Sequence, residues 1–218
     1  MRTPGPSADG PRALLLDYGG VLTAPIERSF SRFEEEVGMP PGRSFALLVR
    51  ASRTSGGGPI GALERGELSV EGFDAELRRL LADDGYEVAA DRSLLEGLLA
   101  AMEPSGRLWE LPAAARRAGL KTGLLSNSWG MSAYPFDLLR AHFDDLVISG
   151  EVGLRKPDPA IYRLAAERLS VAPSVCVLID DLERNVEVAR ELGMIGIVHR
   201  GDDEATLAAV SAAVGLDL

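Results

Sequence analysis

The chain has 218 residues, enough for one sizeable domain or for a core domain with a small insert. Its 33 acidic and 23 basic residues give a net charge of −10, which argues against nucleic acid or an anionic membrane as the main partner. No apolar run approaches the roughly 18 residues of a membrane span. The Pro- and Gly-rich residues 1–12 lack the apolar segment of a secretory signal, so we expect a disordered lead there.

The chain has one cysteine, Cys176, which excludes an internal disulfide. It lies within an apolar run, and this position predicts a small buried core residue rather than a reactive thiol. Such cysteine usage fits a reducing, cytoplasmic location. Nothing in the pattern indicates an oligomeric state.

An apolar strand that ends in a carboxylate is predicted near the N-terminus. Residues 13–16 are apolar without alternation, as in a parallel strand that is covered on both faces. Asp17 then falls at the carboxyl end, where open α/β sheets place their ligands. Gly19 and Gly20 allow a sharp turn and a close approach of the backbone. Asp17 therefore belongs either to an active site or to a tight turn that it caps.

Residues 25–104 carry the spacing of helices. Apolar residues recur three and four positions apart in four segments, at residues 27–37, 45–52, 63–82 and 93–102. Glycine, proline and aspartate clusters separate these segments, and no strand-like alternation occurs between them. We predict an all-helical cap over residues 25–104.

Strands alternate with helices in the rest of the chain. Apolar runs predict strands at residues 121–127, 146–149, 175–179 and 195–198. Helices are predicted at residues 106–118, 135–142, 159–169 and 185–192, with Asp158 as an N-cap. This alternation favours an α/β fold with a doubly wound parallel sheet. The predicted core domain comprises residues 13–24 and 105–218, and the cap is inserted between them.

Three predicted strands end in polar side chains that carry chemistry. They are Asp17, Ser126 with Asn127, and Asp180 with Asp181. Because the carboxyl ends of parallel strands lie along one edge of the sheet, these side chains are expected to converge. Each alone has a plain explanation as a turn or a helix cap. Together they indicate one active site.

A loop at residues 153–157 can bring the ammonium group of Lys156 to the same edge. Crowded carboxylates repel one another unless a cation joins them, and hard oxygen ligands suit Mg²⁺. With Mg²⁺ present, Asp17 can act as a nucleophile toward phosphorus. Ser126, Asn127 and Lys156 can then hold the oxygens of the transferred phosphoryl group.

Four motifs follow one another along the chain, at residues 17–22 (DYGGVL), 125–129 (LSNSW), 154–159 (LRKPDP) and 179–185 (IDDLERN). With these motifs the chain resembles the haloacid dehalogenase superfamily of aspartate-nucleophile hydrolases. Within it, the chain is most similar to the N-terminal phosphatase domain of soluble epoxide hydrolase and its stand-alone bacterial relatives. The resemblance covers nearly the whole chain from Ala13 onward. It implies a Rossmann-like core with a helical cap inserted after the first motif.

The resemblance also implies a role for each residue of the site. Asp17 is the implied nucleophile, Ser126 and Asn127 contact phosphate, and Lys156 stabilises charge on the nucleophile and the phosphoryl group. The implied cofactor is Mg²⁺, held by Asp17, the backbone carbonyl of Gly19, Asp180 and, as the main carboxylate partner, Asp181. The implied substrate is a small phosphorylated molecule.

Gly19 departs from the pattern of the family's phosphatases. In those enzymes a second aspartate stands at this position, where it protonates the leaving group and later activates water. The loss of a general acid/base typically costs about 10²–10⁴-fold in rate. Metal binding and phosphoryl capture are therefore expected to survive, whereas turnover is in question.

Three hypotheses for the function follow. The first is a Mg²⁺-dependent phosphatase that hydrolyses a small phosphomonoester through an aspartyl-phosphate intermediate, with the acid/base supplied by water, the substrate or another residue. The second is a 2-haloacid-type dehalogenase, whose leaving halide needs no proton but whose chemistry makes no use of the Asp180–Asp181 pair. The third is a binding domain of this fold with impaired turnover, which Gly19 supports.

The substrate is expected to be selected by the cap and by the segment after the second motif. Four cap arginines are candidates for gripping an anionic substrate, although surface positions are the safer interpretation: Arg28, Arg32, Arg50 and Arg53. Trp129 and Tyr134 are candidates for the mouth of the site or for simple packing.

Overall fold

The computed structural model describes residues 10–53, 55–89, 93–100 and 102–215. Its centre is a five-stranded parallel sheet in the order β3-β2-β1-β4-β5. The strands are β1 (Ala13–Leu16), β2 (Lys121–Ser126), β3 (Asp145–Ile148), β4 (Cys176–Asp180) and β5 (Ile195–Val198). The predicted parallel sheet is confirmed. Residues 1–9 of the predicted disordered lead lie outside the described residues.

The central strand β1 aligns the chemistry-bearing ends of its neighbours. Leu16 pairs with Leu124 of β2 on one side and with Ile179 of β4 on the other. The residue after Leu16 is Asp17 and the residue after Ile179 is Asp180, so these two carboxylates stand level at one edge of the sheet. The register therefore explains why strand ends in different parts of the sequence converge.

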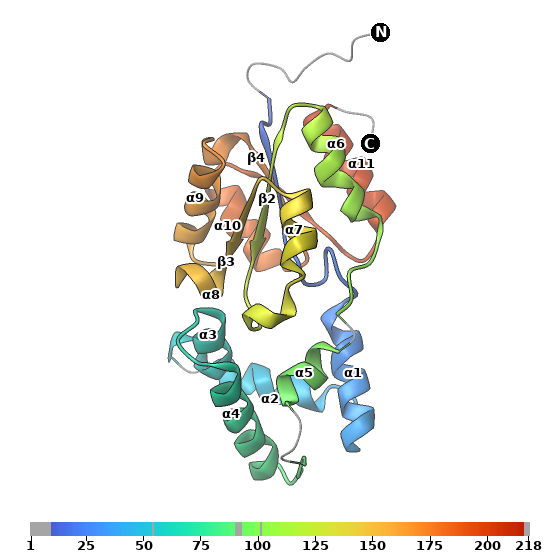
Figure 1. Cartoon of the computed structure of the whole chain (residues 1–218), viewed down its shortest axis with the longest axis vertical. Coiled ribbons are helices and arrows are strands. Elements are labelled where there is room, and N and C mark those ends of the chain that lie inside the picture. The colour runs from blue at the N-terminus through green and yellow to red at the C-terminus, as the bar shows by residue number, and fades with distance from the viewer. Residues whose placement is uncertain (1–9, 54, 90–92, 101, 216–218) are drawn as a thin grey trace.

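Helices cover both faces of the sheet (Figure 1). One layer contains α6 (Leu111–Arg117), α7 (Phe136–His142) and α11 (Asp203–Val214), and the other contains α8 (Ser149–Val152), α9 (Pro159–Arg168) and α10 (Glu183–Glu191). Side chains of β1 alternate between the two layers: Leu14 and Leu16 pack in one core cluster, whereas Ala13 and Leu15 pack in the other. A strand that is apolar throughout is thus buried on both faces, as predicted.

The segment between β1 and the rest of the core is helical where it is described. It holds α1 (Ile26–Val37), α2 (Arg43–Ser52), α3 (Gly58–Glu64), α4 (Val70–Asp83) and α5 (Leu94–Leu99), which share a core of their own. In Figure 1 these helices lie together beyond one end of the sheet. An antiparallel bridge between Thr23 and Pro104 pairs the two ends of the segment. The division into a core and a cap at residues 25 and 104 stays our proposal.

The predicted helix at residues 63–82 is wrong as a single element. The structure breaks it after Glu64 and starts α4 at Val70. Gly66 adopts a left-handed φ of +69°, and the Ser69 side chain accepts a hydrogen bond from the backbone N–H of Gly72, so it caps the new helix. These two residues end one helix and begin the next although the apolar spacing runs through both.

Further differences concern shorter elements and the C-terminal end. The predicted helix at residues 106–118 begins as a 3₁₀ turn before α6. A helix that the pattern did not predict, α11, follows the last strand. The 3₁₀ turns are η1 (Ser55–Gly57), η2 (Arg107–Glu110), η3 (Met131–Ala133) and η4 (Pro173–Val175). Two expectations hold: Cys176 is buried, and the Asp158 side chain caps α9 by accepting from the Ala160 N–H.

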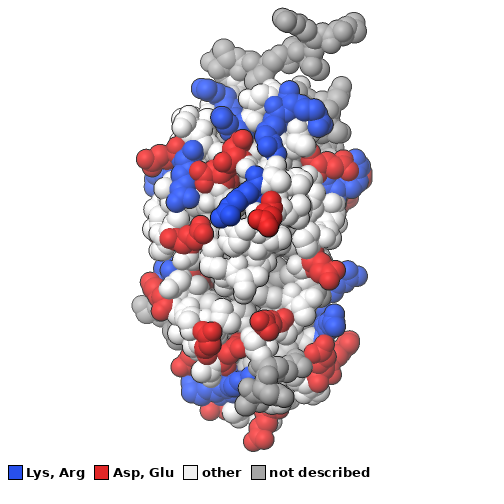
Figure 2. Space-filling view, viewed as in Figure 1, with Lys and Arg blue, Asp and Glu red and all other residues white. Residues whose placement is uncertain are grey.

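Surface charge is spread rather than concentrated. On the described part of the face in Figure 2, Lys and Arg side chains alternate with acidic ones and do not gather into one basic patch. This distribution agrees with the net charge of −10. Among the described residues, no helix is both long enough and apolar enough to cross a bilayer.

Candidate active site

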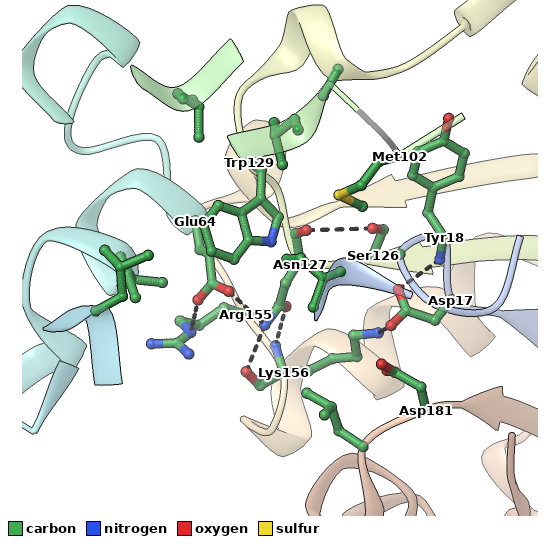
Figure 3. Close-up of a pocket in the computed structure, with 18 of the residues that line it drawn as sticks. Asp17, Tyr18, Glu64, Met102, Ser126, Asn127, Trp129, Arg155, Lys156 and Asp181 are labelled. Carbon is green, nitrogen blue, oxygen red and sulfur yellow. Dashed lines mark hydrogen bonds and ion pairs between the residues drawn. The ribbon is translucent and has the colours of Figure 1, made fainter. Parts of the chain in front are cut away.

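A cavity of about 790 Å³ lies between the carboxyl edge of the sheet and the cap helices. Six of the seven predicted site residues line it: Asp17, Gly19, Ser126, Asn127, Lys156 and Asp181. The seventh, Asp180, is fully buried beneath the cavity, with its carboxylate in contact with Lys156. The structure therefore brings the whole predicted constellation together (Figure 3).

Lys156 joins two of the carboxylates. Its Nζ lies 2.9 Å from Oδ2 of Asp17 and 2.6 Å from Oδ2 of Asp180, and the side chain is only 1% exposed. Burial alone would lower the pKa of Lys156, but the adjacent Asp17 and Asp180 raise it above its ordinary value. The ammonium group is thus held in its charged form.

Asn127 fixes the loop that carries Lys156. The backbone N–H of Lys156 donates to Oδ1 of Asn127 at 2.8 Å, and Nδ2 of Asn127 donates back to the carbonyl of Lys156 at 3.0 Å. This reciprocal pair ties the loop to the end of β2. The predicted phosphate-binding residue and the predicted charge-stabilising residue therefore form one rigid unit.

The two adjacent aspartates have different surroundings. Oδ1 of Asp180 accepts hydrogen bonds from the Leu182 N–H and from Nδ2 of Asn185, both at 2.9 Å, while Oδ2 faces Lys156. Asp181 instead lines the cavity. Its Oδ2 lies 2.6 Å from the point where a Cβ on Gly20 would stand, and Gly20 has a φ of +73°. The turn therefore requires glycine at position 20 for two reasons, its conformation and the closeness of Asp181.

The donor set fits a hard divalent cation. One oxygen from each of Asp17, Asp180 and Asp181 lies within 4.8 Å of the others, and one ammonium group does not balance three carboxylates. Burial raises the pKa of Asp17 well above its ordinary value, although Lys156 opposes the shift. Burial and the neighbouring Asp180 raise the pKa of Asp181 to about 6. Oxygen ligands that carry excess negative charge suit Mg²⁺. The contribution of the Gly19 carbonyl stays a prediction.

Ser126 has a partner that the sequence did not reveal. Its Oγ lies 2.9 Å from the hydroxyl of Tyr134, which is also within hydrogen-bond distance of the carbonyl of Asn127, at 3.2 Å. Trp129 points the other way, toward the cap, where its ring meets those of Phe30 and Phe73 edge-on. Tyr134 is therefore part of the cavity wall beside Ser126, whereas Trp129 connects the loop after Asn127 with the core of the cap.

Met102 covers the position of the missing aspartate. A Cβ placed on Gly19 would lie 3.2 Å from Cε of Met102. Met102 belongs to the segment that returns from the cap to the core, so its methyl group meets Gly19 only in the folded protein. Its sequence position offered no signal for this contact.

Glu64 of α3 reaches from the cap into the same site (Figure 3). Its Oε2 pairs with Nε of Arg155 at 2.6 Å, and its Oε1 accepts from Nδ2 of Asn127 at 3.4 Å. The hydroxyl of Ser149 donates to its backbone carbonyl. A buried ion pair thus links the cap to the loop before Lys156, and the sequence pattern did not indicate it.

The four cap arginines do not serve the cavity in this structure. Arg28, Arg32, Arg50 and Arg53 are all exposed, and the described residues that line the cavity include none of them. The surface interpretation of these residues therefore holds. Arg155 and Arg184, both from the core, are the arginines that line the cavity among the described residues.

Comparisons with known proteins identify the family of the chain. A family model described as haloacid dehalogenase-like hydrolase matches residues 11–193. The chain is 30% identical over 210 residues to bifunctional epoxide hydrolase 2 of Sus scrofa, and the alignment covers 89% of this chain but only 37% of that protein. It is 38% identical over 96 residues to phosphoserine phosphatase of Thermus thermophilus, which covers 41% and 38% of the two proteins.

Among solved structures, the chain is similar to a HAD family enzyme of Bacteroides thetaiotaomicron in complex with magnesium and inorganic phosphate. The TM-score is 0.69 at 23% identity, over 91% of this chain and 99% of that one. This likeness concerns the fold. The family model, which matches residues 11–193, covers all four motifs. The chain belongs to the haloacid dehalogenase-like hydrolase family.

Proposed function

We propose that the protein is a Mg²⁺-dependent phosphatase that hydrolyses a small phosphomonoester through an aspartyl-phosphate on Asp17. One observation carries the proposal: the Asp17 carboxylate lies at the floor of the cavity, 2.9 Å from the Lys156 ammonium and within 4.8 Å of the Asp180 and Asp181 oxygens. Phosphatases among the relatives, such as the Thermus thermophilus enzyme, add support. The chain covers little more than a third of its epoxide hydrolase relative, so no activity of that whole protein is transferred.

In the proposed reaction, an oxygen of Asp17 attacks the phosphorus atom while the bond from phosphorus to the alcohol oxygen breaks. Tyr18 donates its backbone N–H to Oδ1 of Asp17 at 2.7 Å, and Lys156 faces Oδ2, so the carboxylate is held for attack. The Ser126 hydroxyl donates to a phosphoryl oxygen. Asn127 contacts the same group through its backbone N–H, because both N–H bonds of its side chain already face Lys156 and Glu64. When bound, Mg²⁺ supplies positive charge that offsets the charge on these oxygens and on the three carboxylates.

Completion of the reaction requires two proton transfers. The departing alkoxide takes a proton, and the water that attacks the aspartyl-phosphate loses one as inorganic phosphate leaves and Asp17 is regenerated. Gly19 can serve neither step, so the proton donor and acceptor are water, the substrate or another residue. Turnover is therefore expected to be slower than capture of the phosphoryl group.

The upper part of the cavity suggests the nature of the alcohol. Apolar side chains of the cap and of the loop after Asn127 line it, among them Phe30, Leu48, Leu95, Leu99 and Trp129. Burial of apolar surface against such a wall is favourable by about 25 cal/mol per Å². We propose that the alcohol part of the ester is largely apolar and small enough for a cavity of about 790 Å³.

The same geometry bears on the dehalogenase and the binding-domain hypotheses. A dehalogenase gains nothing from Asp181, whose carboxylate crowds Asp17 and carries a pKa raised to about 6. A binding domain with impaired turnover has one specific observation in its favour, the Met102 methyl group over Gly19. A cytoplasmic location, which the single cysteine favours, is part of the proposal; a nucleic acid or membrane partner is not.

The test is an assay of the purified chain on a panel of phosphomonoesters with Mg²⁺ and with EDTA. Phosphate release is expected to need Mg²⁺ and to disappear in Asp17→Asn, whereas Asp137→Asn, which changes an exposed aspartate of α7, retains it. Phosphate release that ignores both EDTA and Asp17→Asn would refute the proposal. Chloride release from a 2-haloacid without metal would support the dehalogenase, and metal and phosphate binding without release would support the binding domain.

A further inference from the structure

Tyr134 is a buried tyrosine whose hydroxyl lies inside the predicted phosphate site. The residue follows the 3₁₀ turn η3 and is only 7% exposed. Its ring packs against those of Tyr18 and Phe136, with centroids 5.0 Å and 6.0 Å away. These contacts fix the hydroxyl in place, 2.9 Å from Oγ of Ser126.

Three oxygen atoms form a small triangle at this point. They are Oγ of Ser126, the hydroxyl of Tyr134 and the carbonyl of Asn127, and their separations are 2.9, 3.2 and 3.4 Å. The carbonyl can only accept, and each hydroxyl has one proton to donate. The two hydroxyls can therefore bond to each other in two ways: Ser126 donates to Tyr134, which donates to the carbonyl, or Tyr134 donates to Ser126.

Of these two, the second leaves the Ser126 proton free for a ligand. A phosphoryl oxygen is an acceptor, so Ser126 must donate to it, and its own oxygen is then available to accept from Tyr134. A hydroxyl that accepts a hydrogen bond is a stronger donor, so Tyr134 strengthens the bond from Ser126 to the ligand against the longer one to the Asn127 carbonyl, 3.4 Å away. The partner of Ser126 thus decides where its proton points.

We infer that Tyr134 is a positioning residue that directs the Ser126 hydroxyl toward the phosphoryl group, an inference that rests on the proposed phosphatase function. Tyr134 acts through Ser126 rather than on the phosphorus atom. Burial raises the pKa of Tyr134 above its ordinary value, so the phenol keeps its proton and remains a donor. The effect of Tyr134 on the Ser126 hydrogen bond is expected to be greatest in the transition state, when the charge on the phosphoryl oxygens is highest.

The experiment measures binding of orthovanadate and of inorganic phosphate to the full chain with Mg²⁺, by isothermal titration calorimetry. Tyr134→Phe keeps the ring and its packing, and circular dichroism and thermal melting verify its fold. One hydrogen bond to a ligand-bound group corresponds to a loss of about tenfold in vanadate affinity. In a Ser126→Ala background, Tyr134→Phe is expected to have no further effect, because its partner is already absent.

Ser128 offers the matched control, since it is a buried serine of the same loop whose hydroxyl contacts Gly130 and Met131 instead of Tyr134. In a Ser128→Ala background the tenfold effect of Tyr134→Phe is expected to persist. Equal vanadate affinity of wild type and Tyr134→Phe, or effects that add in the Ser126→Ala background, would overturn this inference alone. A wild type that binds neither anion with Mg²⁺ and releases no phosphate would overturn the proposed function and this inference with it.

Discussion

The floor and the roof of the cavity differ in the kind of side chain that they present. The floor, at the ends of β1, β2 and β4 and in the loop between α8 and α9, is charged and includes Asp17, Lys156 and Asp181. The roof, from the cap helices, is largely apolar and includes Phe30 and Leu95. Strand register fixes the floor, and helix packing fixes the roof. Under the proposed function, the difference assigns the reaction and the choice of substrate to separate parts of the chain.

The strongest test of the floor removes its ammonium group. Lys156→Met leaves the buried Asp17 and Asp180 facing each other without a cation, and breaking a buried pair costs about 3–5 kcal/mol. We expect a loss of that size in the free energy of unfolding in urea, together with loss of phosphate release. Lys121→Met, which changes the only other lysine, at an exposed position of β2, is the control. Similar stabilities of the two variants would contradict the role given to Lys156.

The next test concerns the place where floor and roof meet. The backbone of Gly19, unlike that of Gly20, lies outside the left-handed region, so it accepts a side chain once Met102 moves by a few tenths of an ångström. If the missing acid/base limits turnover, Gly19→Asp combined with Met102→Ala is expected to raise kcat by about 10²-fold or more. Steady-state kinetics on the best phosphomonoester measures it.

The control for this prediction is Gly19→Asn with Met102→Ala, which adds a side chain of the same size but no acid. A gain in kcat in both double variants would assign the effect to space rather than to proton transfer. No gain in either would mean that another group already does the work, which contradicts the view that Gly19 limits the rate.

The floor was largely predictable from the sequence and the roof was not. Asp17, Asp180 and Asp181 each follow an apolar strand, and parallel strands align such ends wherever they lie in the chain. Glu64 and Met102 contact the floor only because the cap folds back on it; the hydrogen bond from Asn127 to Glu64 spans 63 positions. Local patterns carry no information on such a contact.

The fold shows the same division. Apolar runs located all five strands, because burial on both faces leaves a strong local signal. The break between α3 and α4 was missed, because it depends on one left-handed glycine and one capping serine within continuous helical spacing, Gly66 and Ser69. α11 lies beyond the last strand, in a part of the chain for which the pattern predicted no element.

The test of the roof adds a hydroxyl to it without a change in size. Val49 is a half-buried residue of α2 that lines the cavity, and Val49→Thr places a polar group against the proposed apolar alcohol. Burying an unpaired hydroxyl costs about 1–3 kcal/mol, so KM for an ester with an apolar alcohol is expected to rise about tenfold. Affinity for inorganic phosphate, whose proposed contacts all lie in the floor, is expected to stay unchanged.

The same substitution at Val152 of α8, half-buried but outside the cavity lining, is the control for the roof. If Val49→Thr weakened phosphate and the apolar ester equally, floor and roof would not act separately. If neither changed, the alcohol would not contact this part of the cap.

The smallest expected effect is a pH dependence at Glu64, where the roof reaches the floor. Burial raises the pKa of Glu64 above its ordinary value, although Arg155 and Arg184 favour the charged form. Between the ordinary pKa near 4.5 and the raised one, the folded chain binds more protons at Glu64 than the unfolded chain does. Stability from this group is therefore present at low pH and is lost as pH rises through that window, with a slope of at most about 1.4 kcal/mol per pH unit.

Glu64→Gln removes this titration while it keeps the size of the side chain and an acceptor for Asn127. As pH rises above 4.5, wild type is expected to lose unfolding free energy relative to Glu64→Gln. Urea unfolding at a series of pH values measures this change. Glu67→Gln, at an exposed position three residues further along, controls for general charge effects. A shift in the opposite direction would mean that the attraction of Arg155 outweighs the effect of burial on the pKa of Glu64. The ion pair between roof and floor would then stabilise the folded chain.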